Sequence, residues 1–159
     1  MGHPMYGQNK SDGSLDNISK AWKVVKHRSA KFTASAGIAD TGTVITDGIP
    51  ANFQPVMCIV KNVGTALGSN AAVLEVETSA QTLTASLASL AAGAQIAGMC
   101  DTTDLATDAA WAGYAAAKNI IVETANLVGS SDVAGEESQL EITICGWDLS
   151  VLSDDLAGE

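Results

Sequence analysis

The sequence predicts a mainly β protein whose short antiparallel strands form a β-sandwich. Short segments rich in β-branched and apolar residues recur between glycine, proline and aspartate turn signals. From position 33 onward, the chain lacks the ten-residue helical crossovers that a doubly wound parallel sheet needs between its strands. The 159 residues are enough for one compact domain, with a core built mainly from small apolar side chains.

Six segments carry the strand signal. Thr43–Thr46 is β-branched throughout and is followed by the turn dipeptide Asp47-Gly48. The segment 140–147 alternates with period two, which predicts that one of its faces carries Leu140, Ile142, Ile144 and Gly146. The other predicted strands are 56–63, 71–78, 95–100 and 119–124. Strands at this spacing favour a β-sandwich.

Two segments between these strands have helical character, so we predict one or two short helices. Within 79–92, an apolar helix stripe would carry Leu83, Leu87 and Leu90. The segment 101–117 begins with residues suited to N-capping, and it contains the i, i+3 aromatic pair Trp111 and Tyr114. Long ordered loops are the alternative interpretation of both segments.

The first 30 residues are predicted to form an extended basic arm. Six of the eight basic residues lie in the first 31 positions, and residues 1–19 have too few large apolar groups to fold alone. The arm would bind an acidic surface of a partner, and its candidate binding residues are Lys20, Trp22, Lys23, Lys26, His27, Arg28 and Lys31. The alternative is that 21–28 is an edge strand whose lysines discourage aggregation. The sandwich would span 31–150 and be followed by an acidic tail, 151–159.

The net charge of −10 and a pI near 4.4 argue against a nucleic-acid partner, because phosphate backbones are bound mainly through lysine and arginine. The sequence has no apolar stretch of membrane-spanning length and no signal-peptide pattern at its start. We therefore expect a soluble protein that contacts no membrane and is not exported by the general route.

Residues suited to catalysis or metal binding are scarce. The three cysteines, Cys58, Cys100 and Cys145, lie in separate apolar runs, which is typical of reduced core thiols. Phosphate-binding loops, zinc-protease motifs and nucleophile elbows do not occur. Helix capping explains the acids at 101, 104 and 108 better than a calcium loop does. For His27, a carboxylate or phosphate contact stands against a solvated imidazole. We expect no enzyme activity, no cofactor and no metal.

The order of segments carries a family resemblance over roughly residues 40 to 147. The turn-rich segment 41–52 leads into the apolar strand 56–63, a glycine-rich turn and the Leu-Glu-Val-Glu strand 74–77. After an Ala, Leu and Thr-rich stretch come Ile-Ile-Val-Glu-Thr-Ala-Asn at 120–126, an Asp-x-x-Gly-Glu turn and Leu-Glu-Ile-Thr-Ile at 140–144. This pattern resembles small virion proteins of tailed bacteriophages of jelly-roll type.

The resemblance implies a jelly-roll-like antiparallel sandwich that serves as a capsid decoration, or cement, protein. Such a protein would bind the major capsid protein on the capsid exterior, bridge its subunits and act as a homotrimer, after synthesis in the host cytoplasm. The basic arm and the acidic tail depart from the pattern. The alternative is a tail, fibre or glycan-binding sandwich module for host attachment, whose aromatic platform would draw on Trp22, Trp111, Tyr114 and Trp147.

Overall fold

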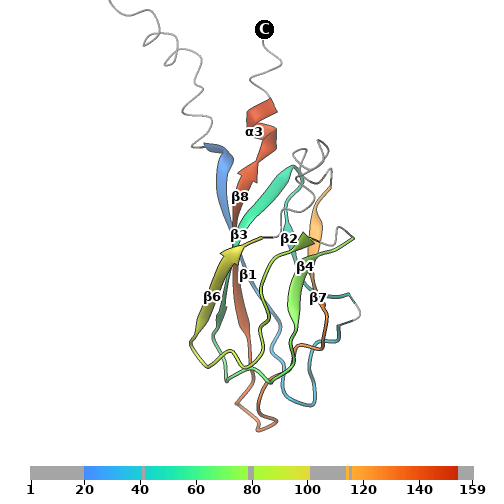
Figure 1. Ribbon diagram of the computed structural model, residues 1–159, viewed down its shortest axis with the longest axis vertical. Helices are drawn as coiled ribbons and strands as arrows, with labels where there is room; N and C mark the ends of the chain where they lie inside the picture. The colour runs from blue at the N-terminus through green and yellow to red at the C-terminus, as the bar shows by residue number, and fades with distance from the viewer. Residues whose placement is uncertain (1–19, 41, 79–80, 101–113, 115, 154–159) are drawn as a thin grey trace, which may run out of the picture.

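The protein is a β-sandwich of two four-stranded antiparallel sheets (Figure 1). The computed structural model describes residues 20–40, 42–78, 81–100, 114 and 116–153. In these residues the strands are β1 (Trp22–Arg28), β2 (Thr43–Ile49), β3 (Phe53–Asn62), β4 (Val73–Val76), β5 (Gln81–Thr82), β6 (Gln95–Met99), β7 (Lys118–Glu123) and β8 (Leu140–Asp148). The short helix α3 (Leu149–Ser153) follows β8 directly. The predicted mainly β sandwich is confirmed.

The strand order places the first half of the chain against the second half. One sheet has the order β1-β8-β3-β6 and the other has the order β2-β7-β4-β5. Strand β1 therefore pairs with β8, β2 with β7, β3 with β6 and β4 with β5, all antiparallel. Most connections cross from one sheet to the other, so each sheet takes strands from both halves of the chain.

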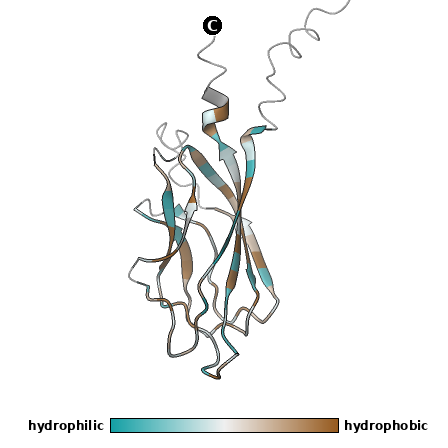
Figure 2. Ribbon diagram, turned by 180° about the vertical axis from the view of Figure 1, so that it is seen from behind, coloured by the Kyte–Doolittle hydropathy of each residue, from teal (hydrophilic) through white to brown (hydrophobic). Residues whose placement is uncertain are grey.

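The core lies between the two sheets and is built from the inward residues of both. Leu140, Ile142 and Ile144 of β8 are fully buried, which confirms the predicted alternation of this strand. From the opposite sheet, Leu74 and Ile120 are buried in the same cluster. Hydrophobic residues accordingly lie along the strands of both sheets (Figure 2). Cys58, Cys100 and Cys145 are buried and free, and burial raises the pKa of the Cys58 and Cys100 thiols to about 12.

The helix predicted over 79–92 is wrong for the residues that the structure describes. Residues 81–82 form β5, and the chain from Leu83 onward is irregular. The Leu83 amide donates to the Leu74 carbonyl at 2.7 Å, and the Leu87 amide donates to the Ala72 carbonyl at 2.9 Å. These bonds run across to the β4 segment instead of along a helix. The regular leucine spacing reflects a loop that repeatedly turns a side chain into the core. Most of the other predicted helix, residues 101–113, lies outside the described residues.

The predicted boundary between arm and sandwich is also corrected, because residues 22–28 are strand β1. This strand pairs with β8 from Trp22 opposite Trp147 to Arg28 opposite Glu141. Of the two interpretations of this segment, the edge strand is the one observed. The sandwich thus begins at residue 22 and not at 31, and residues 1–19 of the predicted arm lie outside the described residues. At the other end, α3 occupies the start of the predicted acidic tail.

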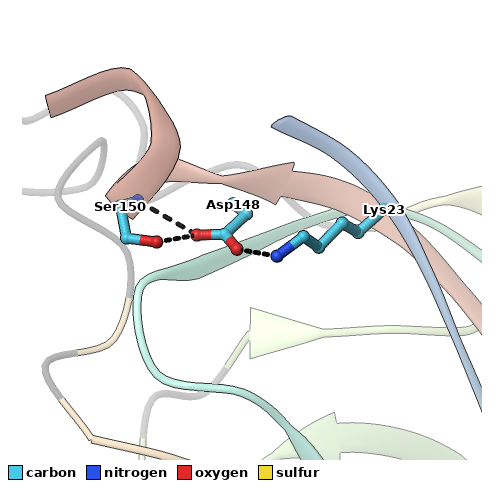
Figure 3. A network of polar contacts seen from close by, with 3 residues as sticks. All are labelled: Lys23, Asp148 and Ser150. Atoms are coloured by element: carbon cyan, nitrogen blue, oxygen red, sulfur yellow. Dashed lines mark hydrogen bonds and ion pairs between the residues drawn. The ribbon is translucent and has the colours of Figure 1, made fainter. Parts of the chain in front are cut away.

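An ionic network fastens the beginning of β1 to the end of β8 (Figure 3). The Lys23 ammonium forms an ion pair with the Asp148 carboxylate. The same carboxylate accepts hydrogen bonds from the Ser150 hydroxyl and from the Ser150 backbone amide, the latter at 3.0 Å, so Asp148 also caps α3. Partial burial works to raise the pKa of Asp148, but the hydrogen bonds from Lys23 and Ser150 outweigh it and leave the pKa below its ordinary value.

The lowered pKa of Asp148 makes the network's contribution to stability depend on pH. A depressed pKa stabilises the fold above the ordinary aspartate pKa of about 3.9, and the contribution is lost as the pH falls through the folded-state value. We expect Asp148→Asn to lower the melting temperature at neutral pH, with the difference from wild type closing below about pH 4. Melting curves recorded by circular dichroism across this range measure the effect. Asp40→Asn is the matched control, and a pH-independent difference for Asp148→Asn would contradict the prediction.

Gly146 is required where β8 passes β3. A Cβ at this position would lie 2.2 Å from the Gln54 carbonyl oxygen and 2.7 Å from the Phe53 ring. Strand β3 shifts its register between Pro55 and Met57, beside this close approach. Backbone at such a distance cannot yield to an added methyl group without moving the strand.

Gly146→Ala should therefore lower the free energy of unfolding by about 1–3 kcal/mol, the usual cost of overpacking. Gly98→Ala is the matched control in the same sheet, since a Cβ added there would meet no atom of the same chain within 4 Å, and in dilute solution it should leave stability nearly unchanged. Urea denaturation of both variants at equal concentration provides the comparison. Equal losses in the two variants would contradict the role assigned to the close approach.

Candidate functional site

The candidate site is the outer face of the sheet β1-β8-β3-β6. Because Ile142 and Ile144 of β8 point into the core, the intervening residues of this strand point outward. The strand registers align the outward residues in rows across the sheet. One row contains Val24, Cys145, Met57 and Met99; the next contains Lys26, Thr143, Ile59 and Ala97; the third contains Arg28, Glu141, Lys61 and Gln95.

One end of this face is apolar. We define the outer apolar patch as Trp22, Val24, Met57, Ile59, Met99 and Trp147. The exposed fractions are 38% for Trp22, 51% for Val24 and 68% for Met99, although these are large hydrophobic side chains. Trp22 and Trp147 lie edge to face, with ring centroids 4.9 Å apart and an interplanar angle of 74°. The pair forms one aromatic end of the patch.

The other end of the same face is charged. Arg28 forms an ion pair with Glu141. In the segments that follow β1 and precede β8, the Lys31 Nζ lies 3.6 Å from Glu137 Oε2. The hydrogen bond from Arg28 lowers the pKa of Glu141, and the charges of Arg28, Lys61 and Lys26 act in the same direction. Among the described residues, Lys26 and Lys61 make no ion pair, so two cationic groups remain available beside the apolar patch.

The predicted binding residues are gathered by β1, but they do not form one cationic surface. Lys20 is exposed just before the strand, and Trp22, Lys26 and Arg28 point outward. Three of the predicted cations are neutralised within the chain: Lys23 by Asp148, Arg28 by Glu141 and Lys31 by Glu137. Acidic residues of β8 and of the turn before it thus form ion pairs with basic residues that the sequence analysis assigned to binding a partner.

His27 makes a contact between the two sheets that the sequence did not indicate. Its ring lies between the two sheets, where Nε2 is 2.9 Å from the Gly48 carbonyl oxygen of β2. Gly48 leaves room for the imidazole, since a Cβ there would lie 2.8 Å from the ring. His27 therefore joins the edges of the two sheets through the Gly48 carbonyl.

The sequence analysis missed the part of the patch that lies on β3 and β6. Met57 and Ile59 alternate with the core residues Cys58 and Val60, so β3 is apolar on both faces. A strand in a sandwich with one solvated face is expected to be polar at alternate positions. The apolar residues at these alternate positions of β3 were the signal in the sequence that the outer face of the sheet is partly apolar.

A metal centre is one alternative to binding through this face. In the part of the chain that the structure describes, no group of three or more His, Cys, Asp or Glu side chains could hold a metal ion. Glu136 lies in an exposed turn, where its carboxylate accepts a hydrogen bond from Ser131 at 2.8 Å.

No helix among the described residues has the length and apolar character needed to cross a membrane.

Comparisons with known proteins do not relate the chain to a family. No family model matches it, and neither the curated proteins nor the solved structures contain a match. The functional interpretation therefore rests on the outer face of the sheet β1-β8-β3-β6 and on the resemblance in segment order.

Proposed function

We propose that the chain is a virion structural protein that decorates the exterior of a bacteriophage capsid, attached through the outer apolar patch. The observation that carries the proposal is the exposure of Trp22, Val24 and Met99 on one continuous face. Soluble proteins rarely leave a contiguous apolar patch exposed unless it binds something, and tryptophan is enriched among residues that dominate binding energy. A cement protein needs such a surface, because it binds the capsid and catalyses no reaction there.

The strand order supports the same proposal through the fold. We infer that the sandwich is a jelly roll, in which a long antiparallel ribbon of paired strands is wound into two four-stranded sheets. The pairing of β1 with β8, β2 with β7, β3 with β6 and β4 with β5 has this form. Jelly rolls occur in viral capsid proteins, but the fold also serves lectins, so the fold by itself does not select the function.

The charged rim gives the proposed attachment its orientation. Lys26 and Lys61 flank the patch without ion-pair partners among the described residues, so they are positioned to meet acids of the major capsid protein. Rim charges contribute mainly to the rate and orientation of docking, while desolvated aromatic side chains contribute most of the affinity. In this proposal, residues 1–19, which precede β1 in the sequence, would extend the bridge to a second capsid subunit.

A second candidate is a tail, fibre or glycan-binding module for host attachment. The observation that favours it is the surface pair Trp22 and Trp147, because sugar rings bind on exposed aromatic side chains. The edge-to-face arrangement offers less flat aromatic surface than a single open ring would. This geometry makes capsid attachment the better supported of the two functions.

Immunogold electron microscopy distinguishes the two candidates. Particles are purified on a density gradient from the source culture and labelled with an antibody raised against this chain. We expect gold on the outside of capsid shells. Label confined to tails or fibres would instead support the host-attachment module, and absence of the chain from all particle fractions would overturn both.

A matched pair of valine substitutions tests the attachment surface. Val24 on β1 and Val44 on β2 are both edge-strand valines, with exposed fractions of 51% and 46%, but they lie on different sheets. A buried carboxylate in the patch would cost more than the lost methyl groups, so Val24→Glu should reduce the occupancy of particles at least tenfold. Val44→Glu should leave occupancy near that of wild type.

Occupancy is measured by adding each purified variant to stripped particles and quantifying the pelleted fraction, with melting temperatures recorded in parallel. Equal occupancy for the two variants, at unchanged melting temperatures, would remove the patch from the proposal.

A further inference from the structure

The four edge strands of the sandwich differ in how they resist pairing with another chain. An exposed edge offers unpaired amides and carbonyls, and proteins block such edges with charged residues, bulges or very short strands. Strand β1 carries Lys23, Lys26 and Arg28. Strand β2 shifts its register twice along β7, and β5 has only 2 residues. Strand β6 has 5 residues, a regular register with β3 and no charged side chain. It alone among the described edges has none of these protections.

The backbone of β6 is oriented for pairing on its open side. The Cys100 amide donates to the Val56 carbonyl at 2.9 Å, and the Asn62 amide donates to the Ala94 carbonyl at 2.9 Å. In an antiparallel ladder these bonds recur at every second residue, so the even-numbered residues of β6 face β3. The amides and carbonyls of Gln95, Ala97 and Met99 therefore point away from the sheet.

We propose that two copies of this chain associate through β6, antiparallel to each other, about a twofold axis at Ala97. In this register Ala97 lies opposite Ala97 of the second copy, and Gln95 lies opposite its Met99. The backbone amides and carbonyls of Gln95, Ala97 and Met99 then form hydrogen bonds with those of the second copy. The sheet β1-β8-β3-β6 thus continues into the corresponding sheet of that copy. The same surface is used on both sides, so the pair is closed and does not propagate.

Charge favours a second copy as the occupant of this edge. The chain carries a net charge of −10, so copies repel each other wherever charged surfaces meet. A twofold axis brings like residues together, and β6 brings together only uncharged ones. Among the described edge strands, only β6 and the two-residue β5 carry no charged side chain, and an interface centred on β6 therefore meets no repulsion from the strand's own side chains.

Side-chain shape gives an independent argument for the same register. On the inward side of β6, a Cβ added to Gly98 would meet no atom within 4 Å. The proposed register sets Ile96 of the second copy beside Gly98, in a closely spaced pair of the ladder. Each isoleucine, already packed against its own core, would cover the opening left by the glycine across the interface.

The proposal replaces the trimer implied by the family resemblance with a dimer, since isologous antiparallel pairing closes after two copies. It does not depend on capsid attachment. A twofold dimer would remain if the chain proved to be absent from virions.

Two substitutions at Ala97 test the dimer without disturbing β3. Ala97→Lys places a cation opposite its own copy at the axis, on an exposed outward position. Ala97→Pro removes an amide that the single chain does not use, as proline is tolerated on the open side of an edge strand. Ala134→Lys, at an exposed turn residue, is the control for the same change of charge.

The molar mass of each variant is measured by sedimentation equilibrium from micromolar to millimolar concentration. Wild type and Ala134→Lys should approach twice the chain mass of 16.2 kDa, whereas Ala97→Lys and Ala97→Pro should stay monomeric over the series with melting temperatures like those of dilute wild type. Monomeric wild type at every concentration, a trimer, or a dimer that survives Ala97→Lys would each overturn the proposal. Should Ala97→Pro fail to fold, Ala97→Lys decides alone.

Discussion

The placement of β8 between β1 and β3 is the constraint on which the rest of the structure depends. Its inward residues, Leu140, Ile142 and Ile144, are fully buried in the core, and its outward residues form the middle of the outer face. Gly146 allows β3 to approach within a distance that no other residue permits. At its end, Asp148 holds Lys23 of β1 and caps α3. One strand thus aligns both neighbours and begins the last helix.

The outer face acquires its character from that alignment. Trp22 meets Trp147, and Val24 falls in one row with Met57 and Met99, because four strands that are distant in sequence lie side by side in the order β1-β8-β3-β6. The same register places Arg28 against Glu141 and so neutralises basic residues that look free in the sequence. The result is a face with an apolar end and a charged end, which suits binding with a defined orientation.

The proposed dimer and the proposed attachment surface share a sheet, and at Met99 they share a residue, but they use different groups of it. Pairing through β6 uses backbone groups along the edge, whereas attachment uses side chains on the face, with Trp22 on the opposite edge strand. Joining two copies would make their outer faces continuous across Met99 and Gln95. Such a dimer would present two patches to a surface at a fixed separation, and two linked contacts hold more firmly than either alone.

The sequence by itself determined the mainly β class, most strand positions and which residues of β8 are buried, because side-chain alternation is a local property of an extended chain. Tertiary structure alone decided whether 22–28 was an arm or a strand, since that depends on a partner more than a hundred residues away in the sequence. It also decided that Leu83 and Leu87 enter the core from a loop, because an i, i+4 spacing does not show where the backbone amides find their acceptors. The apolar patch likewise exists only in the folded chain. Met57 and Ile59 signalled an outer face protected from water, but their neighbours are set by strand order, which local patterns do not encode.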